Sequence, residues 1–230
     1  MKLLKEPPRQ DFSTYVARPE VHFIRREADD PLKEIYARGY LPYSGSQDLY
    51  NIFYSARSAR IVLPELKITS ENRRIAKKFD GTLTKRRIPI DGFKSNEKFY
   101  DFWIAYFAKR HGPDVAPRAR IELWVESSSA VIEYKRGDAT VGYVLEVEDG
   151  DMRHYWYSAY DLAYIKQSLG MWLMLDCIRD AKAAGVKHYY LGTVYGGKAL
   201  YKTNFEPLEW WDSAAWSRDI GRLKKLARED

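Results

Sequence analysis

The chain has 230 residues, of which 45% are hydrophobic and 30% charged, and this ordinary globular composition argues against a disordered chain or a fibre. Its single cysteine, Cys177, excludes an internal disulfide and a metal site with several cysteine ligands. No run of 18 apolar residues is present, and the apolar stretch at the start is too short for a signal peptide, so we expect a cytoplasmic protein that binds no membrane and no metal.

Positive charge is concentrated in one part of the chain. Residues 57–98 hold 12 Lys or Arg and 5 Asp or Glu, a net charge of +7, whereas the whole chain carries +6. This basic block favours a polyanionic partner, although a solvated basic face has the same composition.

Three helices are predicted in the first half of the chain. Asp30 as cap, Pro31 and the terminating Gly39 frame a short one. Strand-like pieces follow between residues 49 and 66, clearest at residues 59–63. The second helix covers residues 71–79 and is capped by Ser70. The third is rich in aromatic residues, begins at the cap Ser95 and ends at Gly112.

The middle of the chain is predicted to form a β-sheet. Alternating apolar and polar residues indicate strands at residues 121–125 and 141–147, and a further strand covers residues 154–159. The pairs Gly137-Asp138 and Asp149-Gly150 are turn signals. These runs fit an antiparallel meander.

A helix over residues 168–184 is apolar on most sides, which predicts that it is buried. It is followed by a strand at 186–191, a short helix at 198–203, a strand at 205–211 and an amphipathic tail helix within 213–229. This order resembles the GNAT (acyl-CoA N-acyltransferase) fold, an α+β fold with a mixed β-sheet flanked by helices. We expect a basic N-terminal α/β extension (1–94), a GNAT-like core (95–212) and a C-terminal amphipathic helix (213–230).

Two short strings carry the first chemical signals. The run from Gln167 to Gly170 resembles the GNAT loop that binds the pyrophosphate of coenzyme A through main-chain N–H groups, but Trp172 replaces a small residue there and argues against coenzyme A. The run from Ala199 to Phe205 resembles the GNAT helix whose tyrosine protonates the leaving group, a task that suits a neutral phenol. Close packing of Gly170 on a helix and of Tyr201 on the sheet are the structural alternatives.

A narrower resemblance covers residues 33–209. Segments 157–161, 167–170, 189–192, 200–202 and 205–207 resemble, in order, the C-terminal domain of the arginyl/leucyl-tRNA–protein transferases, the N-end rule aminoacyltransferases. Upstream, segments 37–45, 68–79 and 99–112 resemble further motifs of that family. The family's N-terminal cysteine cluster has no counterpart in Tyr50–Ser58.

The resemblance implies an enzyme that moves an amino acid, arginine or leucine, from aminoacyl-tRNA to the α-amine of an acceptor protein or peptide. Aminoacyl-tRNA would be a co-substrate, no cofactor is expected, and coenzyme A is considered unlikely. The implied catalytic residues are Tyr201, which protonates the leaving group, and Asp161, which orients the amine. The implied substrate-binding residues are Tyr157, Ser168, Gly170, Tyr190, Gly192 and Lys202. The implied tRNA contacts are Arg73, Arg74, Lys77 and Lys78. The four histidines are interpreted as structural.

Three other functions compete with this hypothesis. The first is a GNAT acyltransferase that uses acyl-CoA through an atypical loop. The second is an inactive relative that binds RNA or protein. The third is a tRNA-dependent transferase that acts on a small molecule or a biosynthetic peptide.

Overall fold

One mixed sheet forms the centre of the computed structural model, which describes residues 1–8, 21–46 and 51–230. Its strand order is β12-β11-β5-β10-β9-β8-β7-β6, and only β9 and β10 run parallel. The strands are β5 (Ser58–Val62), β6 (Thr84–Pro89), β7 (Ala130–Arg136), β8 (Ala139–Asp149), β9 (Met152–Tyr160), β10 (His188–Thr193), β11 (Leu208–Trp211) and β12 (Trp216–Ser217).

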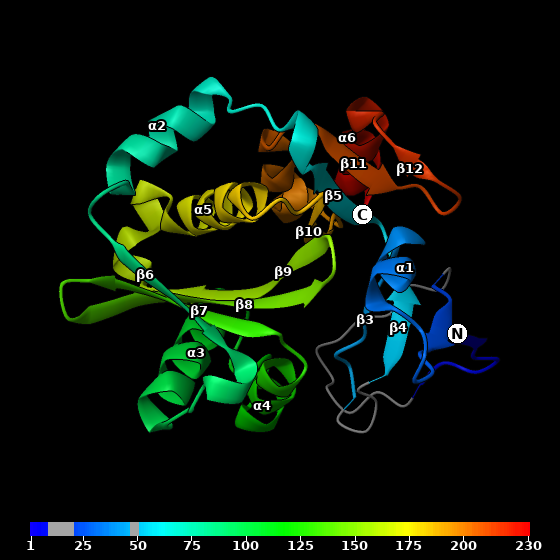
Figure 1. Cartoon of the computed structure of the whole chain (residues 1–230), viewed down its shortest axis with the longest axis horizontal. Coiled ribbons are helices and arrows are strands. Elements are labelled where there is room, and N and C mark those ends of the chain that lie inside the picture. The colour runs from blue at the N-terminus through cyan, green and yellow to red at the C-terminus, as the bar shows by residue number, and fades with distance from the viewer. Residues whose placement is uncertain (9–20, 47–50) are drawn as a thin grey trace.

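Helices cover both faces of this sheet. Figure 1 shows α2 (Ser70–Phe79) and α5 (Leu169–Ala183) on one face, and α3 (Glu97–Arg110) and α4 (Arg118–Glu126) on the other. Because both faces are covered, neighbouring residues of one strand are buried on opposite sides, as Val144 and Leu145 of β8 are. This arrangement confirms the predicted GNAT-like mixed sheet.

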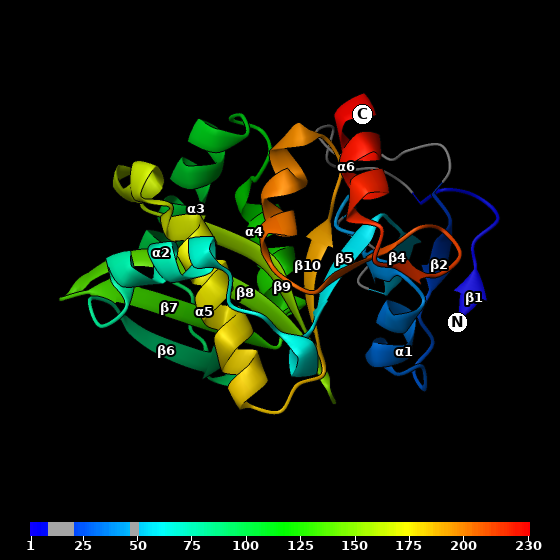
Figure 2. The ribbon, with the colours of Figure 1, turned by 90° about the horizontal axis from the view of Figure 1, so that it is seen from above.

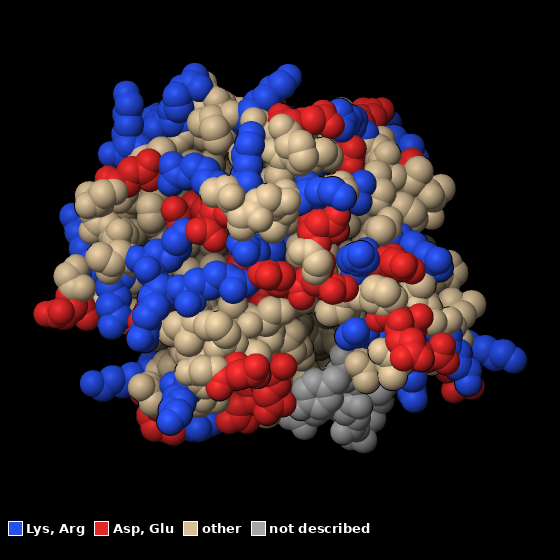
Figure 3. All heavy atoms as spheres, viewed as in Figure 1, with Lys and Arg blue, Asp and Glu red and all other residues tan. Residues whose placement is uncertain are grey.

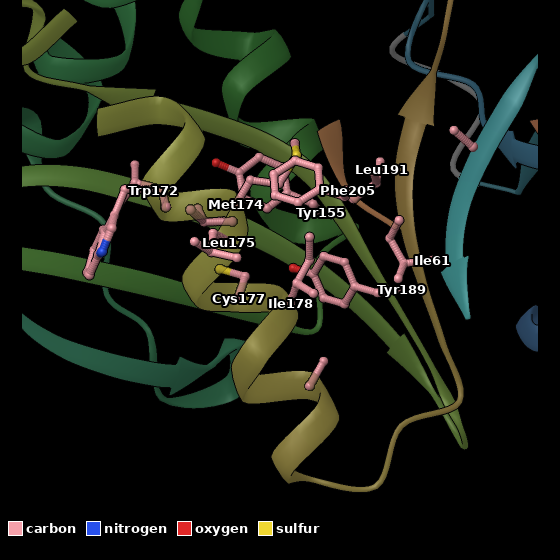
Figure 4. Close-up of a cluster of buried hydrophobic side chains, with 14 of the residues drawn as sticks. Ile61, Tyr155, Trp172, Met174, Leu175, Cys177, Ile178, Tyr189, Leu191 and Phe205 are labelled. Atoms are coloured by element: carbon pink, nitrogen blue, oxygen red, sulfur yellow. The ribbon is translucent and has the colours of Figure 1, made fainter. Parts of the chain in front are cut away.

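The helix α5 lies along the sheet and supplies more buried residues to the core on its side than any other single element (Figures 2 and 4). Eight of its fifteen residues are buried, which explains why its sequence is apolar nearly all round. The helix ends where Gly185 adopts a positive φ of 77° and its N–H bonds to the carbonyl of Lys182. The predicted buried helix is thus confirmed.

The N-terminal part forms a smaller sheet in the order β1-β2-β4-β3. Its elements are β1 (Lys2–Leu3), β2 (Phe23–Arg25), α1 (Leu32–Ala37), β3 (Tyr40–Pro42) and β4 (Ile52–Ser55). β5, α2 and β6 belong to the large sheet and its cover, so the predicted boundary at residue 94 does not coincide with the division between the sheets. Positions 49 and 50 of the predicted strand region lie outside the described residues.

Four short 3₁₀ segments and one more helix complete the chain. They are η1 (Leu63–Glu65), η2 (Ile90–Gly92), η3 (Leu162–Gln167), η4 (Gly197–Asn204) and α6 (Ile220–Glu229). The tail was predicted as one helix, but Trp216 lies in β12 and only the part from Ile220 is helical. In residues 1–8, 21–46 and 51–230, no helix combines the length and the apolarity that crossing a bilayer requires.

The strand predicted at residues 121–125 is wrong, because this segment lies in α4. Ile121, Trp124 and Val125 are buried, and their spacing of three and four is that of a helix face. Leu123 is also buried, which produced the misleading alternation.

The three predicted helix caps are each displaced by one residue. Pro31, Thr69 and Asn96 hold the cap positions in place of Asp30, Ser70 and Ser95. The Thr69 hydroxyl and the Asn96 amide oxygen accept hydrogen bonds from backbone N–H groups of the first turn, which satisfies donors that have no partner within the helix.

Replacing Gly39 with alanine is expected to lower the free energy of unfolding by about 2–4 kcal/mol. Gly39 has a positive φ of 79°, and an added Cβ would lie 2.2 Å from Cγ of Trp211 on β11. The control is Gly92→Ala, where no atom lies within 4 Å of the added Cβ. Chemical denaturation of both variants is the measurement, and equal losses would contradict the packing argument.

Candidate functional site

A cavity of about 820 Å³ opens where β9 and β10 part. The two strands are paired at only three positions, the last of which joins His154 to Tyr190. Beyond it, β9 is paired with β8 alone and β10 with β5 alone. A bulge in β10 between Tyr190 and Gly192, with a positive φ of 80° at Gly192, accompanies the separation. The geometry of the sheet therefore creates the cavity.

Five predicted site residues line this cavity: Tyr157, Gly170, Gly192, Tyr201 and Lys202. The ring of Tyr157 stacks on Trp124 with centroids 3.8 Å apart, and its hydroxyl forms a 2.8 Å hydrogen bond with Ser44. The structure thus brings together residues as far as 113 positions apart in the sequence.

Gly170 also has the packing role that was its structural alternative. A Cβ at this position would lie 2.6 Å from the ring of Tyr160, so only glycine lets α5 approach the strand β9 this closely. The position both lines the cavity and sets the separation of helix and strand.

Three predicted site residues do not line the cavity. Asp161 caps η3, because its carboxylate accepts a 2.9 Å hydrogen bond from the N–H of Ala163. Ser168 has a left-handed backbone with a φ of 69° at the start of α5. Tyr190 lies beneath α1, packed edge-on against Tyr36 at 5.0 Å. The orientation of the amine that was assigned to Asp161 therefore has no support in its position.

Several cavity residues were not predicted. They are mainly Tyr106, Arg110 and His111 at the end of α3, His154 and Tyr160 on β9, and Lys198 on η4. Two of the four histidines thus face the cavity, although all four were interpreted as structural. Tyr106, Arg110 and His111 lie within the family motif at residues 99–112. His154 lies in none of the motifs, and it lines the cavity because β9 and β10 separate there.

The charge of the cavity is one-sided. Its lining includes three cationic side chains, those of Arg110, Lys198 and Lys202, two histidines, His111 and His154, and no aspartate or glutamate among the described residues. Burial lowers the pKa of His111, and the nearby Arg110 and Lys198 lower it further. A site of this kind favours an anionic ligand.

Two lining residues have properties that suit proton transfer or anion binding. Tyr201 lines the cavity and is 41% exposed, and burial of its phenol raises its pKa to about 12, so the phenol is protonated at neutral pH. Burial lowers the pKa of Lys202 to about 8. Its ammonium donates a 2.6 Å hydrogen bond to the carbonyl of Thr193.

Trp172 lies outside the cavity lining. Its indole Nε1 donates a 2.8 Å hydrogen bond to Asp80, and its ring packs on Phe79 and Tyr134 in the core between α5 and α2. The bulk of the indole therefore does not fill the cavity, and the sequence argument against coenzyme A that rested on this residue loses its geometric basis.

The basic block of residues 57–98 does not form one uncompensated surface. Six of its twelve cations form ion pairs, many with carboxylates that are distant in sequence: Arg57, Arg60, Arg74, Lys85, Arg86 and Arg87. Arg74 is bound by both carboxylate oxygens of Glu71. The charge count over residues 57–98 could not reveal ion pairs with carboxylates elsewhere in the chain.

Three predicted tRNA contacts have no such partner. In the part of the chain that the structure describes, Arg73, Lys77 and Lys78 of α2 form no ion pair, and we call them the α2 ridge. Figure 3 shows basic side chains projecting from the molecule on the α2 side. Lys78 donates a 3.2 Å hydrogen bond to the carbonyl of Gln167, directly before α5, so one end of the ridge lies close to the cavity.

No three of the described histidine, cysteine, aspartate or glutamate side chains are placed to hold a metal ion. Cys177 is buried in the core, where its sulfur lies 3.3 Å from the hydroxyl of Tyr134. Burial raises the pKa of its thiol well above the usual range. This cysteine is therefore a core residue without thiolate character.

Residues 70–203 match the family model described as an acetyltransferase (GNAT) domain. This match covers more than half of the chain, which therefore belongs to the GNAT acetyltransferase domain family, as the order of elements predicted. Solved structures with a similar fold include the C-terminal domain of a putative lysylphosphatidylglycerol synthetase from Agrobacterium fabrum (TM-score 0.47, 11% identity, 64% of this chain and 49% of that one) and FemX (TM-score 0.45, 10% identity, 70% and 59%).

Among curated proteins, the chain is similar to aspartate/glutamate leucyltransferases. The protein of that name from Methylorubrum extorquens is 28% identical over 219 residues, 86% of either chain, and that from Hyphomonas neptunium is 28% identical over 174 residues, 70% of this chain and 68% of the relative. The Rhizobium meliloti protein is 43% identical over 67 residues, which span 28% of this chain and only 26% of the relative. The predicted resemblance to the aminoacyl-tRNA–protein transferases is thus confirmed.

Proposed function

We propose that this protein transfers an amino acid, leucine in the first instance, from aminoacyl-tRNA to the α-amine of an acceptor with an acidic N-terminal residue. The amine nitrogen attacks the ester carbonyl carbon, a C–N bond forms, and the ester bond to the ribose oxygen breaks. The amine gives up one proton and the ribose oxygen gains one, so the products are an amide and deacylated tRNA.

The observation that carries the proposal is the one-sided charge of the cavity. The 3′ end of a tRNA and an acidic N-terminal residue both bring anionic groups to the reaction. The phosphates of coenzyme A are anionic as well, so the charge supports an anionic substrate, and the name of the relatives favours aminoacyl-tRNA as the donor. Three cationic side chains and two histidines, with no acidic residue in the described lining, fit such substrates. The name of the relatives supports both leucine as the transferred amino acid and aspartate or glutamate as the acceptor.

The basic side chains assigned to tRNA binding form two groups, one on the surface of α2 and one in the wall of the cavity. The α2 ridge lies on the surface and reaches the start of α5 through Lys78. Arg110, His111 and Lys198 come from the ends of α3 and η4, and all three are exposed residues of the cavity wall. We assign the α2 ridge to the tRNA stem and the three wall residues to the phosphates of its single-stranded 3′ end.

Tyr201 is assigned to protonation of the leaving ribose oxygen. Its phenol lines the cavity and is protonated at neutral pH, as an ordinary tyrosine is, and burial raises its pKa further, to about 12. A neutral phenol can donate its proton to an alkoxide that forms in the transition state. The nucleophile is an amine, which needs no covalent activation. Positioning of the substrates and proton donation therefore account for most of the decrease in the activation free energy.

Acyl transfer from coenzyme A is the second candidate, and membership in the GNAT acetyltransferase domain family favours it. The experiment that separates the candidates is incubation of the protein with single charged tRNAs or acetyl-CoA, together with peptides that begin with Asp, Glu or Lys. Mass spectrometry of the peptides identifies the transferred group. The proposal predicts a leucyl residue on the Asp and Glu peptides and none on the Lys peptide, whereas acetylation alone would refute it.

A further inference from the structure

His154 has an unusual position in the wall of the cavity. It is the last residue of β9 that is paired with β10, and only 2% of its surface is exposed. Its Nδ1 lies 3.0 Å from the hydroxyl of Tyr36 on α1. Its Nε2 is fully buried and has no hydrogen-bond partner among the residues that the structure describes. A buried polar atom of this kind costs stability unless a ligand or water satisfies it.

The contact with Tyr36 determines which ring nitrogen carries the proton. Within the described residues, Nδ1 is the hydrogen-bond partner of the buried Tyr36 hydroxyl, so the hydroxyl proton is satisfied only if Tyr36 donates and Nδ1 accepts. Burial and the nearby Lys202 lower the pKa of His154 to about 3, so the ring is neutral. A neutral ring that accepts at Nδ1 carries its proton on Nε2, which therefore faces the cavity wall as a donor.

Lys202 places a second donor beside the first. A Cβ added to Gly192 would lie 3.4 Å from Nζ of Lys202 and 3.7 Å from Nε2 of His154, so both nitrogens lie within 4 Å of one point. The ammonium group uses one of its three protons on the carbonyl of Thr193. Within the described part of the chain, no carboxylate forms an ion pair with it. Two hydrogen-bond donors within 4 Å of one point, one of them a cation, match an anionic oxygen group.

We propose that Lys202 and His154 Nε2–H form a two-donor site for one anionic oxygen group of the substrate, and that Tyr36 is the positioning residue that holds His154 in this tautomer. The identity of the anion rests on the proposed function. It is either the side-chain carboxylate of the acidic acceptor residue or the oxyanion of the tetrahedral intermediate, and the two are distinguished below. The absence of a side chain at Gly192 keeps the space between the two donors open.

The first test is the tautomer of His154 in the free protein, measured by nitrogen-15 NMR of the imidazole. The proposal predicts a neutral ring protonated on Nε2 at neutral pH. Tyr36→Phe removes the hydroxyl that Nδ1 accepts from, so a mixture of tautomers is expected in this variant. Tyr100→Phe is the control, because its hydroxyl bonds to Ser95 far from the site and its loss should leave the pattern unchanged. A ring protonated on Nδ1 in the wild-type protein overturns the proposal.

The second test is the steady-state kinetics of Lys202→Met and His154→Gln with matched peptides that begin with Asp or Asn. If the site binds the acceptor carboxylate, Lys202→Met raises KM for the Asp peptide by about 10- to 100-fold and removes the preference for Asp over Asn. If it binds the oxyanion, kcat falls by about 100-fold or more with both peptides while KM changes little. Lys202→Arg keeps the charge and should restore part of either loss.

The control for these variants is Lys225→Met, which removes an exposed ammonium on α6 and should leave both constants unchanged. Circular dichroism separates a folding defect from a kinetic one, and His154→Gln retains a side-chain N–H donor in case removal of all polar character unfolds the protein. Unchanged KM and kcat in folded Lys202→Met overturn the proposal.

Failure of the proposed function gives a different result from failure of this site. If the wild-type protein transfers no amino acid from any charged tRNA, the proposed function fails, and the site is then tested by titration with Asp-Ala and Asn-Ala dipeptides. A shift of the His154 Nε2 resonance with Asp-Ala but not with Asn-Ala supports the site. A protein that transfers no amino acid forms no oxyanion of this kind, so the carboxylate is then the remaining ligand, and no shift with either dipeptide overturns the site.

Discussion

Replacement of Tyr201 with phenylalanine is expected to lower the rate of amino-acid transfer by roughly 10²- to 10⁴-fold, the usual contribution of a general acid. The ring is retained, so the cavity wall and the binding of aminoacyl-tRNA should be nearly unchanged. Only the hydroxyl is lost, and that hydroxyl is the protonated group that the cavity presents at neutral pH. The measurement is a single-turnover time course with saturating enzyme, which separates chemistry from product release.

Tyr164→Phe is the matched control for this variant. Tyr164 lies on η3 outside the cavity lining, and its hydroxyl accepts a hydrogen bond from Arg136. The rate of this control should equal that of the wild type. A wild-type rate in Tyr201→Phe would show that the phenol is structural and that the proton reaches the ribose oxygen through water or the vicinal hydroxyl.

Reversal of the charge on the α2 ridge is expected to weaken tRNA binding by on the order of 10- to 100-fold at low salt. The variant replaces Arg73, Lys77 and Lys78 with glutamate and leaves Arg74 in its ion pair with Glu71. Phosphate contacts release counterions when they form, so the slope of log affinity against log salt should also fall by about two to three. Affinities measured by filter binding at several salt concentrations give both quantities.

A matched control reverses three positive charges on α6 in place of the α2 ridge. Lys224, Lys225 and Arg228 lie on α6, and their replacement with glutamate alters the net charge equally. Affinity that falls as far in this control as in the ridge variant would mean that net charge, and not the position of the α2 ridge, governs tRNA binding.

The sequence correctly predicted those helices and strands whose apolar periodicity and turn residues are sufficient to define them. The apolar periodicity of α5 and the turn residues around β8 were sufficient for a correct prediction. The segment of α4 was mistaken for a strand because Ile121, Leu123 and Val125 alternate, while the burial of Trp124, which reveals the helical face, depends on the sheet that covers it. Tertiary contacts thus determine that α4 is a helix, since its local sequence pattern fits either a strand or a helix.

The candidate site could be predicted only in part, for a similar reason. The motif that ends in Tyr201 and Lys202 gave two residues that do line the cavity. The role of His154 depends on the separation of β9 from β10 and on a tyrosine 118 positions earlier in the chain, and neither is visible in a linear pattern. The basic block was overestimated because five of its twelve cations form ion pairs with carboxylates outside the block, which the local charge count does not connect to them.

Competition between the two donor classes tests the central claim most directly. The wild-type protein is mixed with equal concentrations of leucyl-tRNA and acetyl-CoA and with one peptide that begins with aspartate, and the mass of the peptide is followed over time. The proposed function, which rests on the α2 ridge and on the similarity to aspartate/glutamate leucyltransferases, predicts that the peptide gains a leucyl residue. Ribonuclease treatment of the leucyl-tRNA should abolish the gain. A peptide that gains an acetyl group in the same tube, and no leucyl residue, would contradict the account.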